Sequence, residues 1–287
     1  MSTYEDYADA SGHYDSTRIA VGHEIILGHL AAGPVPLADL ALLDAGCGTG
    51  NYAAALAPHI GSLAIVDASG QMLAVAADKL AATVGAPVAT ARTGTLQALP
   101  FEADSFDAVI TNQVLHHLER ESDAGWPEHA TVFAEYARVL RPGGVLVVNT
   151  CSREQVRHGY WAFSLIPLGT EELVLRYAPL DVLEDLARVN GLVPAGRFVA
   201  TDATIQGDAY FDSDGPLSES WRRSDSTWSL SPPAEMDAMI ATVTGMRGRG
   251  ELDAYVVAHD ARRPHIGQTT FLVSRAPVAV DATAPFG

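Results

Sequence analysis

The sequence predicts an α/β fold in which an open, mostly parallel sheet carries helices on both faces. Two observations lead to this prediction. Ala41–Leu43 is short and apolar, as expected of a strand covered on both faces, and a glycine turn joins it directly to a helical segment at 51–57. Further short apolar segments then alternate with helical ones as far as residue 150, which is typical of strand–helix–strand units.

The composition narrows the class of protein. The chain has 287 residues, 48% of them hydrophobic, which is enough for one large domain or for a core domain with a cap. A formal net charge of −17 argues against DNA or RNA as a partner. The sequence holds no run of about 18 apolar residues, and Met1–Ala10 lacks the features of a signal peptide. We therefore expect a cytoplasmic protein without a membrane partner, either a monomer or a homodimer.

The cysteines give no sign of a metal site. Cys47 and Cys151 are the only two, and their spacing matches no metal-binding pattern. Such sparse cysteine usage fits a reducing compartment. We therefore expect no bound metal.

The glycine turn carries the most specific signal. Its sequence is Asp44-Ala45-Gly46-Cys47-Gly48-Thr49-Gly50, and its glycines let the backbone turn sharply and approach a ligand closely. A dinucleotide fingerprint, G-x-G-x-x-G, would need its third glycine at position 51, which is Asn51. The spacing therefore disfavours a dehydrogenase.

The pattern D-x-G-x-G-x-G resembles motif I of the class I S-adenosylmethionine (SAM) dependent methyltransferases, specifically the UbiE/type-11-like enzymes that act on small molecules. The resemblance implies SAM as cofactor, S-adenosylhomocysteine as product, and a Rossmann-like sheet of seven strands, six parallel and the last antiparallel, with inserted cap segments. The cationic amino group and sulfonium of SAM favour a carboxylate at the turn, which Asp44 supplies. The turn residues implied to bind the cofactor are Asp44, Ala45, Gly46, Gly48 and Gly50.

The second strand, Ser62–Val66, ends at an acidic residue. Asp67 lies about 20 residues beyond the glycine turn, where a ribose-binding carboxylate is expected in such folds. The segment from Asp67 to Leu73 also resembles the D-x-S-x-x-M-L segment of the family. The resemblance implies that Asp67 binds the ribose, that Ala68 also contacts the cofactor and that Met72 lies against adenine, although Met72 alone could equally be a core residue.

The third strand, Pro87–Arg92, precedes a departure from the family pattern. Thr93–Phe101 is similar to G-D-A-x-x-L-P-F, but Thr95 stands where an aspartate usually accepts the adenine amine. A hydroxyl can still accept that hydrogen bond. The resemblance implies that Leu96 offers its backbone N–H to adenine.

The fourth strand, Ser105–Asn112, leads to candidate catalytic residues. Ligands of open α/β sheets gather at the carboxyl ends of the strands, so Asn112 and Gln113 should face the methionine end of SAM. His116 and His117 follow in a segment similar to the L-H-H-L of the family. Either histidine could act as a base near neutral pH, and His117 is the favoured substrate contact. A packed structural pair is the alternative.

The remaining elements complete the sheet. A helix at 131–140 ends at an Arg-Pro-Gly-Gly turn, followed by a fifth strand that begins at Val145–Val148. A helix at 179–190, a sixth strand at 197–205 and a last strand at 268–274 follow. The family topology would place the last strand between the fifth and the sixth.

The N-terminal part resembles a lid. A helix is expected over 17–30, and Tyr14 and Arg18 belong to a segment similar to the Y-D-x-x-R of small-molecule methyltransferases. The resemblance implies that both approach the cofactor carboxylate, for which a guanidinium is well shaped. A solvated helix start is the alternative.

These predictions divide the chain into seven parts. They are an N-terminal lid at 1–33, a SAM-binding core at 34–151, an inserted lid at 152–178, a core helix and strand at 179–207, an inserted cap at 208–267, the last core strand at 268–277 and a tail at 278–287. The pocket candidates in the two insertions are Tyr160, Trp161, Trp221 and Arg223. An ordinary cap core would explain them equally well.

The predicted function is methyl transfer from SAM to a small-molecule nucleophile. In this reaction the protein supplies alignment and excludes water, and it needs a base only if the nucleophile must lose a proton. Two alternatives stay open: non-transfer chemistry such as cyclisation with SAM bound, and a non-catalytic SAM-binding protein. The sequence does not identify the atom that is methylated.

Overall fold

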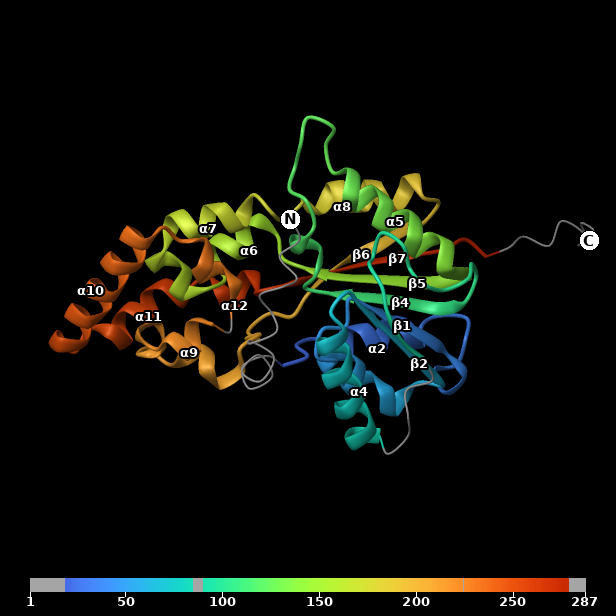
Figure 1. The fold of residues 1–287 in the computed structure, drawn as a ribbon, viewed down its shortest axis with the longest axis horizontal. Helices are drawn as coiled ribbons and strands as arrows, with labels where there is room; N and C mark the ends of the chain where they lie inside the picture. Colours follow the sequence, from blue (N-terminus) through green and yellow to red (C-terminus); the bar gives the residue numbers. More distant parts are fainter. Residues whose placement is uncertain (1–18, 85–89, 224, 279–287) are drawn as a thin grey trace, which may run out of the picture.

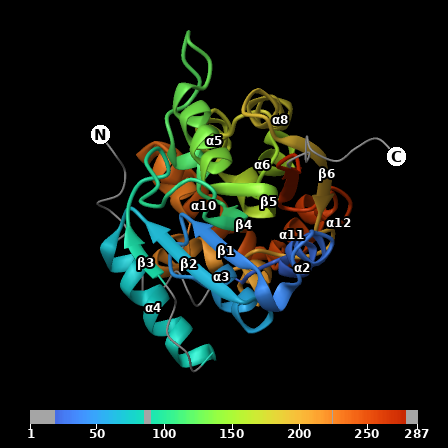
Figure 2. The same ribbon diagram turned by 90° about the vertical axis from the view of Figure 1, so that its right-hand side faces the viewer.

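The structure, a computed structural model, describes residues 19–84, 90–223 and 225–278. Its centre is a seven-stranded sheet in the order β3-β2-β1-β4-β5-β7-β6; Figure 1 labels all of these strands except β3, which Figure 2 labels. The strands are β1 Ala41–Ala45, β2 Ser62–Asp67, β3 Thr90–Thr93, β4 Phe106–Asn112, β5 Leu140–Thr150, β6 Val193–Val199 and β7 Thr270–Arg275. β7 pairs antiparallel with both β5 and β6, and the other strands run parallel. The predicted sheet and the place of its last strand are confirmed.

Helices cover both faces of the sheet, as Figures 1 and 2 show. The helices on one face are α2 His23–Ala31, α3 Asn51–Leu56 and α4 Gly70–Val84, and those on the other are α5 Pro127–Val139 and α8 Leu180–Val189. Successive side chains of a strand point to opposite faces. Leu42 accordingly joins the core that contains α2, whereas Leu43 joins the core that contains α5. A strand apolar on both sides is what this sandwich requires.

Several predicted boundaries are wrong. The sixth strand was expected over 197–205 but spans Val193–Val199, because Asp202 adopts the left-handed conformation (φ 60°) and the chain turns there. β5 begins at Leu140, and the predicted turn at 141–144 forms an irregularity in the strand, where the partners change from Phe106–Leu140 to Ala108–Val145. Part of the predicted third strand, and both Tyr14 and Arg18, lie outside the described residues.

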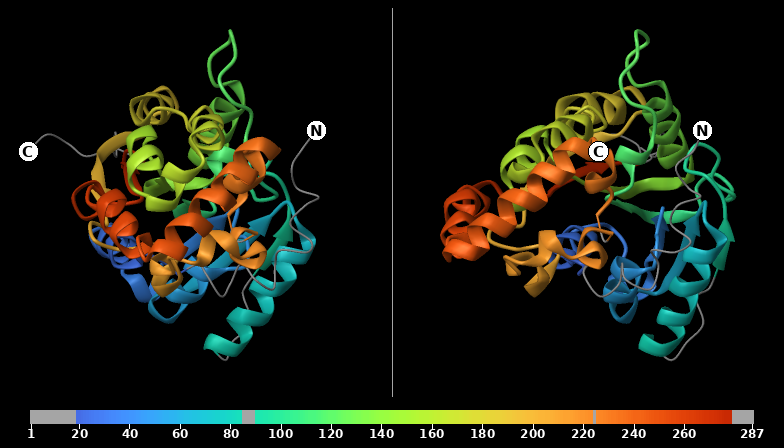
Figure 3. Two further views of the ribbon diagram at one scale, coloured as in Figure 1. Left: turned by 90° about the vertical axis from the view of Figure 1, so that its left-hand side faces the viewer. Right: turned by 60° about the vertical axis from the view of Figure 1, so that its left-hand side comes forward.

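The two inserted segments share one apolar core. Their helices are α6 Arg153–His158, α7 Pro167–Val174, α9 Glu219–Arg222, α10 Pro233–Arg249, α11 Leu252–Asp260 and α12 Arg263–Ile266. Trp161 and Ile166 of the first insertion pack in the same cluster as Tyr210 and Val243 of the second. Figure 3 shows the orange helices of the second insertion beside the yellow-green helices of the first. We call this unit the cap.

The position of the cap follows from the topology. The chain leaves the sheet for the cap at the end of β5 and again at the end of β6, and it returns from the second insertion at the start of β7, which runs antiparallel. These three junctions lie at the carboxyl ends of the parallel strands, the edge where ligands of such sheets bind. None of the helices in the described ranges is long and apolar enough to cross a membrane.

Candidate functional site

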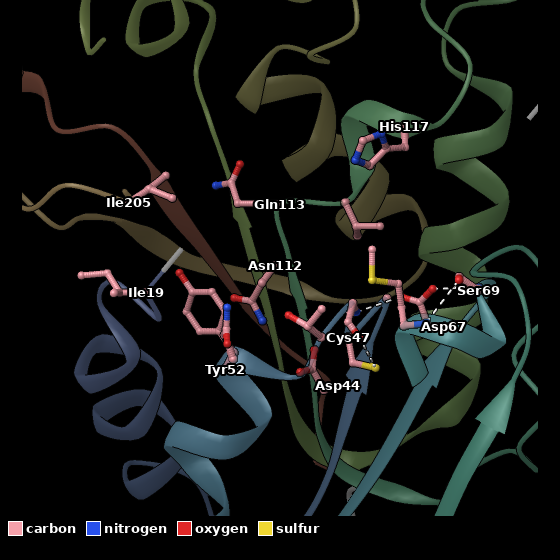
Figure 4. A pocket seen from close by; sticks show the side chains of 16 residues that line it. Ile19, Asp44, Cys47, Tyr52, Asp67, Ser69, Asn112, Gln113, His117 and Ile205 are labelled. Carbon is pink, nitrogen blue, oxygen red and sulfur yellow. Dashed lines mark hydrogen bonds between the residues drawn. The ribbon is translucent and has the colours of Figure 1, made fainter. Parts of the chain in front are cut away.

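A cavity that is partly open to solvent lies at the carboxyl ends of β1, β2 and β4, and together with the solvent space at its mouth it has a volume of about 970 Å3. Figure 4 shows Asp44 and Asn112 in its middle, with Asp67 and Ser69 toward one side and Ile19 and Ile205 toward the other. The residues that line it are Ile19, Asp44, Gly46, Cys47, Gly48, Thr49, Asn51, Tyr52, Asp67, Ser69, Met72, Asn112, Gln113, Val114, His117 and Ile205.

The glycine turn shapes the floor of the cavity. Gly46 and Gly50 have φ angles of 75° and 79°, which side chains of L-residues rarely adopt. A Cβ atom at Gly46 would lie 2.9 Å from Val114, and one at Gly50 would lie 2.9 Å from Ala76. A Cβ at Gly48 would meet no atom of the described residues within 4 Å, so none of their side chains covers the Gly48 backbone where it lines the cavity. The three glycines therefore have two roles: close packing at Gly46 and Gly50, and access at Gly48.

Asp67 is fixed by the backbone around it. Its Oδ2 accepts a hydrogen bond from the N–H of Gly48 at 2.8 Å, and its Oδ1 accepts one from the N–H of Ser69 at 2.9 Å. Burial raises the pKa of this carboxyl above its usual value, and these N–H groups oppose the change. Each carboxylate oxygen has a second lone-pair direction, so both can still accept a hydroxyl donor. Asp67 is thus a fixed acceptor for two adjacent hydroxyl groups.

Asp44 is buried without a full set of partners. Its side chain is 1% exposed, and its Oδ1 has no hydrogen-bond partner within the described part of the chain. Burial raises the pKa of this carboxyl to about 7, an effect that the nearby Asn112 amide opposes and the charge of Asp67 increases. The Asn112 amide lies close enough to Asp44 to act on its carboxyl, but neither polar atom of its side chain meets a partner at full hydrogen-bond geometry there. Unpaired buried polar groups are costly, so this arrangement favours a polar, cationic ligand group beside Asp44.

The structure brings many of the predicted cofactor residues together. Those that line the cavity are Asp44, Gly46, Gly48, Asp67, Met72, Asn112 and Gln113. The others, Ala45, Gly50, Ala68, Thr95 and Leu96, do not line it. Gly50 packs under the turn, and Leu96 is buried in the core that contains α5. Their predicted contacts with the cofactor stay predictions.

One of the two predicted histidines reaches the cavity. His117 lines it, and His116 does not. The two rings lie 4.1 Å apart between centroids, and His116 stacks on Tyr177 at 4.8 Å, with a 19° interplanar angle. The cap residue Tyr177 therefore contacts His116, the neighbour of the cavity-lining His117.

The pocket candidates in the insertions lie away from the cavity lining. Trp161 is 1% exposed, and its Nε1 donates to the carbonyl oxygen of Tyr210 at 2.7 Å. Tyr160 is buried and stacks on Phe163. The last two candidates are Trp221 and Arg223, of which the first donates to the carbonyl of Ala209 and the second pairs at the surface with Glu219. In this structure these residues build the cap rather than the wall of the cavity.

Sequence reasoning missed eight lining residues. They are Ile19, Cys47, Thr49, Asn51, Tyr52, Ser69, Val114 and Ile205. Most of them neighbour a predicted site residue and could have been found by extending each motif. Ile19 and Ile205 are different, because they are far apart in the sequence and meet through a backbone hydrogen bond from the Ile19 N–H to the Ile205 carbonyl, 3.0 Å long. No local pattern indicates that contact.

Comparison with known proteins finds methyltransferases among the relatives of this chain. Residues 43–148 match the model of a methyltransferase domain. The chain is 34% identical over 172 residues to an uncharacterised methyltransferase of Mycobacterium tuberculosis, covering 56% of this chain and 81% of that protein. It is 28% identical to a ubiquinone biosynthesis O-methyltransferase of Cereibacter sphaeroides, covering 58% and 65% of the two chains.

A solved structure agrees with the whole fold. A protein described as a methyltransferase from an antibiotic biosynthesis pathway of Anabaena variabilis superposes with a TM-score of 0.68 at 20% identity, covering 90% of this chain and 99% of that one. This likeness extends through the cap. The chain belongs to the class I SAM-dependent methyltransferases.

The described residues fit the cofactor of this family. The unpartnered Asp44 oxygen suits the amino group of SAM, and the fixed oxygens of Asp67 suit the two ribose hydroxyls. Met72 lies in the cavity lining, where a polarisable thioether can contact an adenine ring.

Proposed function

We propose that this enzyme transfers the methyl group of SAM to a nucleophile on a small molecule and releases S-adenosylhomocysteine. One observation carries the proposal: the buried Asp44 and the half-buried Asn112 present unpartnered polar atoms to a cavity built over the glycine turn. Such atoms favour a polar ligand group, and the cofactor of this family carries a cationic amino group that suits a carboxylate. The parts of the chain predicted as lid and cap belong to the same proposal, as the elements that enclose the substrate.

A small acceptor is favoured by the surroundings of the cavity. The insertions form a cap with its own core at the carboxyl edge of the sheet, and inserted segments at that edge often build substrate pockets. The relative from Cereibacter sphaeroides is named for an O-methyltransferase of ubiquinone biosynthesis, which supports a small-molecule acceptor. The net charge of −17 makes a nucleic acid an unsuitable partner.

In the proposed mechanism the protein binds, orients and excludes water. When bound, SAM supplies an electrophilic methyl group on a good leaving group. Asp44 would hold the amino group and Asp67 the ribose, while Asn112 would contact the methionine part. His117, which lines the cavity, takes the proton of an acceptor hydroxyl where one must be lost. Alignment at near-attack distance then supplies most of the rate enhancement.

The test is calorimetric titration with SAM and with S-adenosylhomocysteine. We expect micromolar binding by the parent protein and at least tenfold weaker binding by Asp67→Ala, since Asp67 is the ribose acceptor. Asp208→Ala removes an exposed aspartate and serves as the control. If the parent protein binds neither compound, the proposal is wrong.

The mass of the product separates the alternatives. Incubation of the SAM-loaded enzyme with a metabolite library should yield a product that is heavier by one methyl group. A changed product without added mass would indicate cyclisation or other non-transfer chemistry. Tight SAM binding with no conversion of any acceptor would favour a non-catalytic binding protein.

A further inference from the structure

Polar side chains beside the cavity tie together the ends of three strands. Gln113 follows β4, Asn149 belongs to β5, and Thr269 precedes β7. The Nε2 of Gln113 donates to Asn149 Oδ1 at 3.1 Å and to Thr269 Oγ1 at 2.7 Å. A primary amide carries only two hydrogens. Both donors of Gln113 are therefore used inside the protein.

The chain of hydrogen bonds continues to the far side of the cavity. Asn149 Nδ2 donates to the hydroxyl of Tyr52 at 2.8 Å, and this hydroxyl donates to the carbonyl oxygen of Val21 at 2.9 Å. The Nε2 of Gln113 needs an acceptor, so the Oδ1 of Asn149 must face it. The Nδ2 of Asn149 then faces Tyr52 and can donate to its hydroxyl. Tyr52 accepts that hydrogen bond and directs its own proton to Val21. Thr269 Oγ1 also donates to Asn149 Oδ1, so Gln113 and Thr269 together orient the Asn149 amide, and Gln113 links to both of them.

This chain ends on a segment that forms part of the cavity. Ile19 lines the cavity, and its N–H donates to the carbonyl of Ile205, another lining residue. Gly22 has a φ angle of 72°, and a Cβ atom there would lie 2.7 Å from the ring of Phe271 in β7. The segment at 19–22 is therefore seated closely against the sheet, and the Tyr52 hydroxyl holds its carbonyl in place.

The backbone of Gln113 also points to a positioning role. Its φ angle is 53°, in the left-handed region, and its N–H donates to the Asn149 carbonyl at 2.8 Å. Figure 4 shows that its side chain points away from Asp44 and Asn112. Unfavourable backbone conformations persist where surrounding contacts determine them, and they cluster at functional sites. Its neighbour Asn112 differs, because both polar atoms of its side chain lack a partner within the described residues.

We propose that Gln113 is a positioning residue. Through Asn149 it fixes the positions of Tyr52 and of the 19–22 segment, and so it shapes one side of the cofactor cavity. The amide offered to the cofactor is that of Asn112. This role differs from the direct cofactor contact that the sequence predicts for Gln113. It rests on the proposed function, because the quantity that it tunes is cofactor affinity.

The experiment is a double-mutant cycle on the affinity for S-adenosylhomocysteine. Gln113→Met keeps the length of the side chain and removes its hydrogen bonds, and Tyr52→Phe removes only the hydroxyl. We expect each single variant to bind five- to tenfold more weakly than the parent. Because both interrupt one chain, the double variant should be at most twofold weaker than the weaker-binding single variant.

Additional readouts separate positioning from a general loss of structure. Thermal unfolding must show each variant fully folded at the titration temperature, so that coupling in affinity does not reflect an unfolded fraction. Gln71→Met makes the same change at an exposed position of α4 and should leave affinity within twofold of the parent. If Gln113→Met does not fold, Gln113→Glu carries the same cycle.

The outcomes distinguish this proposal from the proposed function. Affinity losses that multiply in the double variant, or an unchanged affinity in Gln113→Met, overturn the positioning role alone, provided the parent binds. A parent protein that binds neither SAM nor S-adenosylhomocysteine contradicts the proposed function and the positioning role together. Coupled losses in folded variants support both.

Discussion

Asp67 at the end of β2 accepts a hydrogen bond from the backbone N–H of Gly48 at 2.8 Å. The carboxylate proposed to bind the ribose therefore also fastens the glycine turn to the neighbouring strand. The same side chain accepts the N–H of Ser69 at the start of α4. The proposed cofactor binding and the local stability of the turn thus involve the same residue.

Replacement of Asp67 should consequently lower both the stability of the protein and its affinity for SAM. Asp67→Ala leaves two N–H groups without their acceptor, and each such loss costs about 1–3 kcal/mol where the groups stay away from water. We expect the free energy of unfolding to fall by about 2 kcal/mol and SAM affinity to fall at least tenfold. Urea unfolding and calorimetry measure the two effects. Unchanged unfolding with weakened binding would show that the Gly48 contact does not stabilise the turn.

The buried Asp44 should make the stability of the cofactor-free protein depend on pH. Burial raises the pKa of its carboxyl from 3.8 to about 7. The folded protein then holds this proton more tightly than the unfolded chain does, so this group stabilises the fold at low pH. Its contribution is lost as the pH rises through 7, at about 1.4 kcal/mol per pH unit between pH 5 and 7.

Asp44→Asn isolates this effect. The difference in unfolding free energy between variant and parent should grow in favour of the variant from pH 5 to pH 8, measured by urea unfolding without cofactor. The variant should at the same time lose most of its SAM affinity. A difference that stays constant with pH would mean that Asp44 titrates alike in the folded and unfolded states.

Local motifs made half of the cavity predictable. Asp44, Gly48 and Asp67 sit at strand ends whose position follows from a short apolar run and a glycine turn. Ile19 and Ile205 could not be predicted, because their contact depends on how the segment before α2 crosses the segment after β6. The left-handed backbone at Gln113 gives no sequence signal either, since it is imposed by partners on β5 and β7.

The aromatic residues of the insertions show a second limit. Trp161 and Trp221 suit a substrate pocket and a cap core equally well, since both environments favour large, partly polar rings. The structure packs Trp161 against residues of both insertions. The role of such a tryptophan depends on which distant segments pack against each other, and the composition of the insertions does not indicate this packing.

Trp161 should therefore act on stability more than on the cofactor. Trp161→Phe removes the Nε1 donor and leaves the Tyr210 carbonyl unpaired in the core of the cap. We expect a loss of about 2–3 kcal/mol in the free energy of unfolding, with SAM affinity within twofold of the parent. Urea unfolding and calorimetry on the same preparation test this. An affinity loss greater than tenfold in folded protein would instead place Trp161 in contact with the ligand.

His129 should make the stability of the fold depend on pH in the direction opposite to that of Asp44. It lies on α5, is fully buried beside Trp126, and neither ring nitrogen has a hydrogen-bond partner among the described residues. Burial lowers the pKa of its imidazole from 6.5 to about 4. Between pH 6.5 and pH 4, His129 therefore binds a proton in the unfolded chain but not in the folded protein. The free energy of unfolding falls as the pH drops through this range. The loss amounts to about 3 kcal/mol.

His129→Leu should remove this dependence, because leucine fills a similar volume and does not titrate. Relative to the parent, the variant should gain unfolding free energy steadily from pH 6.5 to pH 4.5, a window in which the Asp44 contribution is common to both proteins and cancels. His59→Leu, at an exposed position, should follow the parent curve. Parallel curves for His129→Leu and the parent would mean that a proton reaches His129 in the folded state, and that the core between α5 and the sheet admits a charge.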